Sequence, residues 1–155
     1  MAEKTIDIAS PILSRNERLA DQLRQRFKET NTYVINSCRA RSARPPRSWA
    51  LTSACATRLA CAVPSSRGDI ASDVDAITMK EAGMPAIQIN TGGLCHLEGN
   101  MIMEAVDAFD QAVGLENIDV IFIENVGNLV CPVDFDLGEN LSIMILSVPE
   151  GDDKP

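Results

Sequence analysis

Residues 85–127 read PAIQINTGGLCHLEGNMIMEAVDAFDQAVGLENIDVIFIENVG, and this stretch decides the fold. The pattern predicts a strand over 85–90, a helix over 97–114 and a second strand over 118–127. The last segment opens with a continuous apolar run, which is typical of a strand buried on both faces. A strand, a helix and another strand in this order form a βαβ unit. The sequence therefore predicts an α/β fold whose mostly parallel sheet is covered by helices.

Segments outside this unit extend the same alternation. Residues 10–29 predict an amphipathic helix, because Ile12, Leu13, Leu19, Leu23 and Phe27 recur at helical spacing, with Ser14 or Asn16 as a possible cap. Further elements are expected as a strand at 32–36, a helix from about 72 to 83 and a strand at 141–148. In parallel sheets, ligands bind beyond the carboxyl ends of the strands. The loops after 90 and after 124, and the junction near 69, should therefore meet at one rim.

Composition sets limits on the class of protein. The chain has 155 residues and a net charge of −8, which fits a single domain and argues against nucleic acid as a partner. Aromatic residues make up only 4%, so the core should be aliphatic. No apolar run reaches the roughly 20 residues that span a bilayer, and the N-terminus lacks an apolar signal core. We expect a cytoplasmic protein whose five cysteines are thiols or metal ligands.

Two loops of the expected rim carry metal-ligating side chains. Cys95 and His96 are adjacent and follow Gly92-Gly93, while Cys131 lies on a second loop. Two thiolates and an imidazole suit Zn²⁺ or Ni²⁺. Three ligands leave one coordination position open, which a symmetry mate could fill. The alternative is a buried cysteine and a surface histidine that bind no metal.

Acidic side chains stand at the same rim. Glu124 ends a buried strand and Gly127 follows, in the layout of a D-x-x-G switch segment with Glu replacing Asp. An acid in that place holds Mg²⁺ through water, and the glycine amide meets a γ-phosphate. Asp69 and Asp73 are further candidates for Mg²⁺-linked acids. The alternatives are an ordinary acid after an apolar strand and, for Asp73, a first-turn residue favoured by the helix dipole.

Taken together, the motifs resemble one family. Residues 10–36 and 68–155 are similar to the hydrogenase nickel-incorporation GTPases of the HypB family. The resemblance rests on the helical start ILSRNERLADQLRQRF and on the ordered segments GDIASDVDA, QINTGGLCHL, FIENVGNLVCP, FDLGE and LSVPEGDDKP.

The resemblance implies a P-loop NTPase-like fold of the SRP/MinD type, with three layers. It implies GTP-dependent nickel delivery to [NiFe]-hydrogenase, with a related role for urease, and GTP, Mg²⁺ and Ni²⁺ or Zn²⁺ as cofactors. The expected partners are a second copy joined through the metal site, a HypA-like nickel metallochaperone and the hydrogenase large subunit. The metal ligands would be Cys95, His96 and Cys131. The nucleotide-linked residues would be Asp69, Asp73, Glu124 and Gly127.

The family pattern fails at one segment. No G-x-x-x-x-G-K-[ST] occurs in the chain, and residues 30–68 contain six arginines and no acid. Back-translation of 42–46 in a shifted frame permits Gly-Lys-Thr-Thr, and the same offset over 63–67 permits Ala-Val-Val-Glu. These products predict a frameshift over about 37–67, with loss of the phosphate loop, the following helix and most of the second strand. The N-K-x-D motif that reads guanine is also missing, as in a truncated C-terminus.

The sequence thus predicts one partial GTPase domain over 1–155. Its parts are an N-terminal helix and first strand (10–36), an aberrant basic segment (37–67) and a half that carries the switch and metal residues (68–155). Such a chain should neither bind GTP tightly nor hydrolyse it, although the resemblance is to GTPases. Two alternatives remain: a Zn/Ni-binding dimerisation module without catalysis, and a non-functional gene fragment.

Overall fold

The computed structural model describes residues 9–39, 59–65, 84–127 and 130–145. The elements in chain order are α1 (Ala9–Thr30), β1 (Tyr33–Arg39), β2 (Leu59–Ser65), β3 (Ala86–Asn90), α4 (Gly99–Val113), η1 (Leu115–Asn117), β4 (Val120–Glu124), η2 (Cys131–Asp134) and β5 (Leu141–Ile145). Every expected element within these ranges is present, with bounds shifted by a few residues. The helix expected at 72–83 and the acids Asp69 and Asp73 lie outside the described residues.

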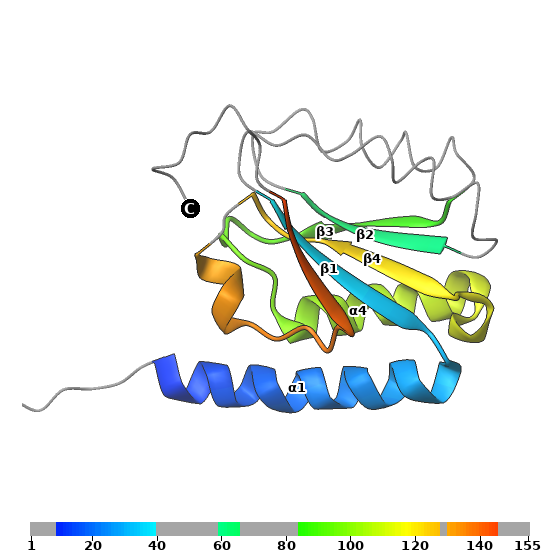
Figure 1. Ribbon diagram of the computed structural model, residues 1–155, viewed down its shortest axis with the longest axis horizontal. Helices are drawn as coiled ribbons and strands as arrows, with labels where there is room; N and C mark the ends of the chain where they lie inside the picture. The colour runs from blue at the N-terminus through cyan, green and yellow to red at the C-terminus, as the bar shows by residue number, and fades with distance from the viewer. Residues whose placement is uncertain (1–8, 40–58, 66–83, 128–129, 146–155) are drawn as a thin grey trace, which may run out of the picture.

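The strands form one parallel sheet in the order β3-β2-β4-β1-β5 (Figure 1). β4 lies between β1 and β2, with Ile121 in register with Val34 on one side and Ala60 on the other. Four of its five residues are buried, as its continuous apolar run predicts. Because every pair is parallel, the carboxyl ends of all five strands point to the same edge of the sheet.

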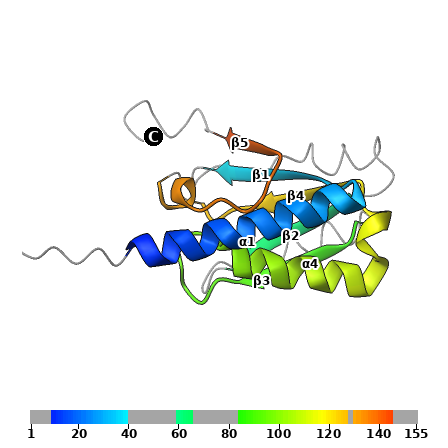
Figure 2. The ribbon, with the colours of Figure 1, turned by 90° about the horizontal axis from the view of Figure 1, so that it is seen from below.

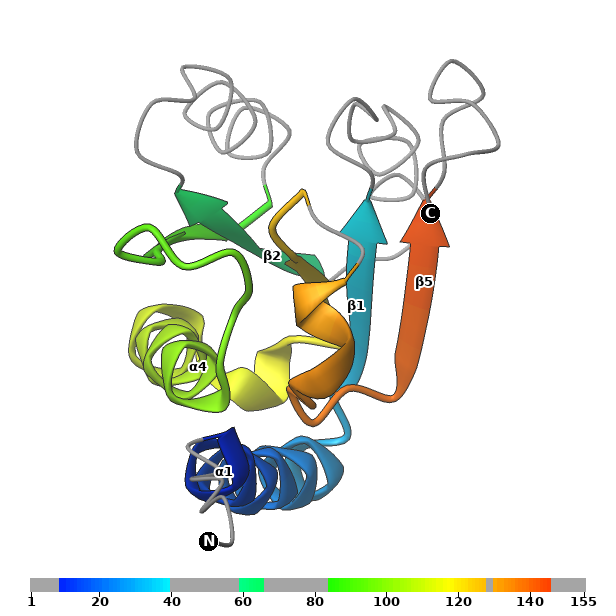
Figure 3. The same cartoon turned by 90° about the vertical axis from the view of Figure 1, so that its left-hand side faces the viewer.

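Helices α1 and α4 pack side by side against one face of this sheet (Figures 2 and 3). This arrangement confirms the predicted α/β class with a parallel sheet. Of the three layers expected, the described ranges supply these helices and the sheet. Neither helix in the described part of the chain is long and apolar enough to cross a membrane.

The buried stripe of α1 differs from the expected one. Leu23 and Phe27 are buried as predicted, whereas Ile12 is 48% exposed. The helix begins at Ala9, so Asn16 lies in its interior and is buried rather than capping its start. The predicted cap is therefore wrong, because the helix extends one turn or more before either candidate.

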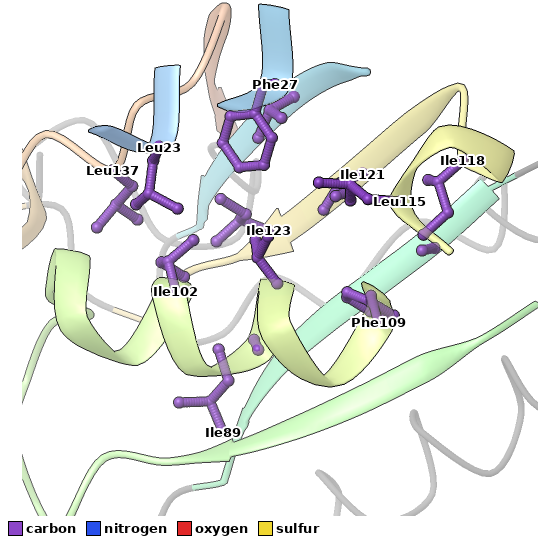
Figure 4. Close-up of a cluster of buried hydrophobic side chains, with 14 of the residues drawn as sticks. Leu23, Phe27, Ile89, Ile102, Phe109, Leu115, Ile118, Ile121, Ile123 and Leu137 are labelled. Atoms are coloured by element: carbon purple, nitrogen blue, oxygen red, sulfur yellow. The ribbon is translucent and has the colours of Figure 1, made fainter. Parts of the chain in front are cut away.

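The core fills the space between the two helices and the sheet (Figure 4). Phe27 from α1, Ile102 and Phe109 from α4, and Ile121 and Ile123 from β4 are all almost completely buried. Most of the cluster is aliphatic, as the low aromatic content predicts. Burial of apolar side chains of this size contributes about 1.5–3 kcal/mol each to folding.

The expected loss of the second strand is wrong. β2 runs through 59–65 and pairs in parallel with β3 on one side and β4 on the other. Its sequence, LACAVPS, begins with an apolar run that suits a central strand whatever reading frame produced it. The sheet therefore has no gap between β3 and β4.

β5 forms the outer edge of the described sheet, next to β1. Leu141, Ile143 and Met144 expose 43%, 38% and 58% of their surface. Within the described ranges, no strand pairs with the other side of β5. This edge therefore presents apolar side chains and unpaired backbone groups together.

Candidate metal centre

A glycine turn carries the first half of the candidate site. It leaves the carboxyl end of β3, where the Gly92 N–H donates to Asn90 Oδ1 at 3.0 Å and the Leu94 N–H donates to the Thr91 carbonyl at 3.2 Å. Gly92 and Gly93 have φ values of +64° and +96°, in the left-handed region that side chains avoid. The turn reverses the chain so that Cys95 and His96 stand at the edge of the sheet, as predicted.

The structure brings two of the three predicted ligands into contact and places the third close to them. Cys95 Sγ lies 3.7 Å from His96 Nδ1, and Cys131 of η2 is near enough to Cys95 to raise the pKa of its thiol. In a tetrahedral zinc site, Zn–S and Zn–N bonds of about 2.3 and 2.1 Å place sulfur and nitrogen about 3.6 Å apart. The Cys95–His96 pair is therefore spaced as two ligands of one metal ion would be.

Two further contacts orient the His96 ring. It stacks on Phe135, with ring centroids 3.8 Å apart and planes inclined by 20°. Its Nε2 lies 3.4 Å from Glu98 Oε1. Metal-bound histidines usually donate their second ring N–H to a carboxylate or carbonyl. These contacts leave Nδ1 toward Cys95 and Nε2 toward the carboxylate, the division of roles that a metal ligand needs.

The Cys95 thiol holds its proton more tightly than a free thiol does. The pKa of Cys95 is raised, first by the interaction with Cys131 and then by desolvation. Metal binding must release this proton. In the described ranges, no set of three or more His, Cys, Asp or Glu side chains is already arranged to hold a metal. The donors suit Zn²⁺ or Ni²⁺ in chemistry, and Cys131 has to shift to complete the set.

The predicted nucleotide-linked residues are only partly described. Glu124 ends β4, is buried, and stands in register with Ser37 at the end of β1. Gly127 is half-buried three residues further on. Both lie at the predicted edge of the sheet. Asp69 and Asp73 fall outside the described residues. The structure therefore locates two of the four predicted nucleotide-linked residues, Glu124 and Gly127.

Sequence reasoning missed the buried amides behind this edge. Asn36 and Asn125 are 3% and 0% exposed, and the Asn125 N–H donates to the Ser37 carbonyl at 2.9 Å. Asn125 follows the acid directly in IENVGN, so a polar side chain next to a buried strand was the available signal. Nothing in the sequence pairs it with Asn36, which lies 89 residues away.

The parallel sheet with helices packed on one face makes this an α/β protein, and its sheet with an acid at the tip of a buried strand is similar to that of the P-loop NTPases. The family model described as cobW: CobW/HypB/UreG, nucleotide-binding domain, matches residues 63–145. The chain belongs to this CobW/HypB/UreG family.

Curated relatives are maturation factors. The chain is 40% identical over 152 residues to the hydrogenase/urease maturation factor HypB of Helicobacter hepaticus, covering 98% of this chain and 62% of that protein. It is 39% identical over 156 residues to the hydrogenase maturation factor HypB of Escherichia coli, covering 98% and 51%. The chain thus spans about half to three fifths of the length of these relatives.

Solved structures agree in fold. HypB from Helicobacter pylori in complex with nickel matches with a TM-score of 0.74 and 33% identity, over 90% of this chain and 63% of that one. HypB from Archaeoglobus fulgidus matches with a TM-score of 0.76 and 34% identity, over 90% and 66%. These findings confirm the predicted resemblance to HypB.

Proposed function

We propose that this chain is the nucleotide-binding part of a nickel-delivery factor, acting in the GTP-dependent maturation of [NiFe]-hydrogenase or urease. The observation that carries the proposal is the contact of Cys95 with His96, with Cys131 near Cys95, in a family member whose relatives are hydrogenase and urease maturation factors. Nickel is the cargo, and these residues would hold it; Zn²⁺ suits the same donors.

The nucleotide side of the proposal rests on the end of β4. Glu124 and Gly127 would serve the Mg²⁺ and the γ-phosphate of bound GTP, together with Asp69 and Asp73. The chain contains no G-x-x-x-x-G-K-[ST], so its backbone offers no sequence-defined phosphate nest and no P-loop lysine. We therefore expect weak GTP binding and little hydrolysis by this chain.

A metal-bridged pair of chains is the second part of the proposal. Leu94, Val130 and Val133 flank the two cysteines and are 42%, 71% and 73% exposed. Apolar side chains around a metal site with an open coordination position favour contact with a second copy. A HypA-like metallochaperone and the hydrogenase large subunit would be the donor and the acceptor of nickel.

Metal titration tests the proposal. Ni²⁺, Zn²⁺ and Co²⁺ are titrated into the reduced chain, and binding is followed by calorimetry and by the thiolate-to-cobalt absorption band. Cys95→Ala, His96→Ala and Cys131→Ala should each weaken binding at least about tenfold. Cys38→Ser, which removes another described thiol on β1 but keeps a donor beside Asn36 Oδ1, is the matched control and should bind normally.

The same samples separate the two candidate functions. Light scattering with and without EDTA measures the metal-dependent dimer, and a fluorescent GTP analogue measures nucleotide binding. Metal binding with dimerisation but no nucleotide binding favours a dimerisation module without catalysis. Equal metal binding by the three ligand variants and the wild type would refute the site.

A further inference from the structure

A chain of buried amides runs behind the candidate metal centre. Asn125 Oδ1 accepts hydrogen bonds from the Leu97 N–H at 3.3 Å and from the Val126 N–H at 2.9 Å. Asn125 Nδ2 donates to Asn36 Oδ1 at 3.4 Å. Asn36 Nδ2 in turn donates to Glu139 Oε1 at 3.1 Å. This series of hydrogen bonds thus runs from Asn125, just after β4, through Asn36 in β1 to Glu139.

The far end of the chain is a carboxylate with several donors. Glu139 Oε2 accepts from the Leu137 N–H at 2.9 Å, and Oε1 also accepts from the Ser142 hydroxyl at 2.7 Å. The Cys38 thiol lies 4.0 Å from Asn36 Oδ1 as an additional weak donor. Each link is therefore a donor facing an acceptor.

The donor-to-acceptor direction of this series of hydrogen bonds is fixed at both of its ends. The Leu97 N–H can only donate and a carboxylate can only accept, so each amide has one orientation that satisfies both neighbours. Aligned hydrogen bonds polarise one another, and a buried amide with the wrong neighbour costs about 1–3 kcal/mol. The two asparagines are almost completely buried, so water cannot replace a lost partner.

Both ends of this chain belong to segments of the metal centre. Leu97 follows His96 directly, and Leu137 lies two residues after Phe135, whose ring stacks on His96. We propose that Asn125 and Asn36 are positioning residues that hold the Cys95–His96 loop and the Cys131 segment at a fixed separation. This inference rests on the proposed metal binding.

A donor–acceptor swap tests the proposal. Asn36→Asp removes the donor and places a second carboxylate against that of Glu139. Glu139→Gln places an amide N–H, a donor, against the Nδ2 donor of Asn36. In the double variant, the new amide at position 139 donates to the new carboxylate at position 36, and its oxygen accepts from the Leu137 N–H. The aligned chain is thereby restored with unchanged net charge. Rescue therefore reports the contact between positions 36 and 139, and an effect on metal binding and on the Leu97 amide reports that this contact is coupled to the loop of Cys95 and His96.

The measurement is Co²⁺ titration of the full reduced chain, read from the thiolate-to-cobalt band. Each single variant should raise Kd by about 10–100-fold and change the band, as loss of outer-shell partners does. The double variant should return to within about threefold of the wild type. Asn100→Asp, which adds the same charge on α4, is the matched control and should bind normally.

Metal-free hydrogen exchange at the Leu97 amide is the second measurement. Its protection should fall in each single variant and return in the double variant. Single variants that bind Co²⁺ normally, or a double variant as weak as the singles, would overturn the positioning role at the metal site. If the wild type gives no thiolate band, the proposed metal site fails and the positioning role fails with it. Normal binding with altered Leu97 protection would leave the hydrogen-bond series as a structural contact only.

Discussion

Gly138 should be intolerant of any side chain, and the cost can be worked from its neighbours. A Cβ at this position would lie 2.8 Å from the Ala20 carbonyl oxygen and 2.9 Å from Leu23 Cβ, both on α1. Gly138 also has a φ of +77°, which costs a residue with a side chain about 1–2 kcal/mol. Overpacking against atoms that cannot turn away adds about 1–3 kcal/mol. The expected total for Gly138→Ala is about 2–5 kcal/mol.

Gly92→Ala is the matched comparison. Gly92 has a similar φ of +64°, but a Cβ there would meet nothing within 4 Å. It should therefore cost only the backbone part, about 1–2 kcal/mol. Urea unfolding of both variants in EDTA measures the difference, provided that the slope with denaturant is unchanged. Equal destabilisation of the two variants would refute the close packing of the 136–139 segment against α1.

Other substitutions test the core and its polar contacts. Phe109→Ala should cost about 3–5 kcal/mol in urea unfolding, because the ring is almost completely buried, and a loss below about 1 kcal/mol would contradict its place in the core. Asn16→Ala should cost about 1–3 kcal/mol, because Asn16 Oδ1 accepts from the Gly99 N–H at 2.7 Å and Asn16 Nδ2 donates to the Asp136 carbonyl at 2.7 Å. Asn16→Asp keeps the first contact but sets a buried carboxylate against the Asp136 carbonyl, so it should destabilise as well. The pKa of Asp110 is lowered by the hydrogen bond from the Leu115 N–H and by Arg26. The ionised Asp110 therefore stabilises the folded chain above pH 3.8, and this contribution is lost as the pH falls through the lower pKa of the folded state. Asp110→Asn should reduce the loss of folding stability measured as the pH falls from about 5 to 2.

The elements of the fold that could be predicted are those with a clear local pattern of apolar residues. The apolar run of β4 and the spacing of Leu23 and Phe27 on α1 gave the correct elements, because burial selects residue types directly. For β2, the comparison with the family motifs predicts a lost strand, whereas its own apolar run, LACAV, predicts a strand, as the structure has it. A strand forms where apolar residues can pair with adjacent strands, and β2 has such residues and pairs with β3 and β4.

For the candidate site, the sequence predicts only that the proposed ligands gather near one edge of the sheet. Cys95, His96 and Cys131 follow strand ends, and the parallel topology carries strand ends to one edge. The stacking of His96 on Phe135 and the pairing of Asn125 with Asn36 depend on side-chain directions and on contacts between residues far apart in the chain. No periodicity records such contacts.

The edge at β5 would influence how the chain behaves in concentrated solution. Among the described residues no strand pairs with the outer side of β5, so its backbone donors and acceptors beside Leu141, Ile143 and Met144 form a template on which another molecule can assemble. The rate of such encounters rises with the square of the protein concentration. Storage life would then fall as the protein concentration rises, and a molecule bound along this edge would lengthen it.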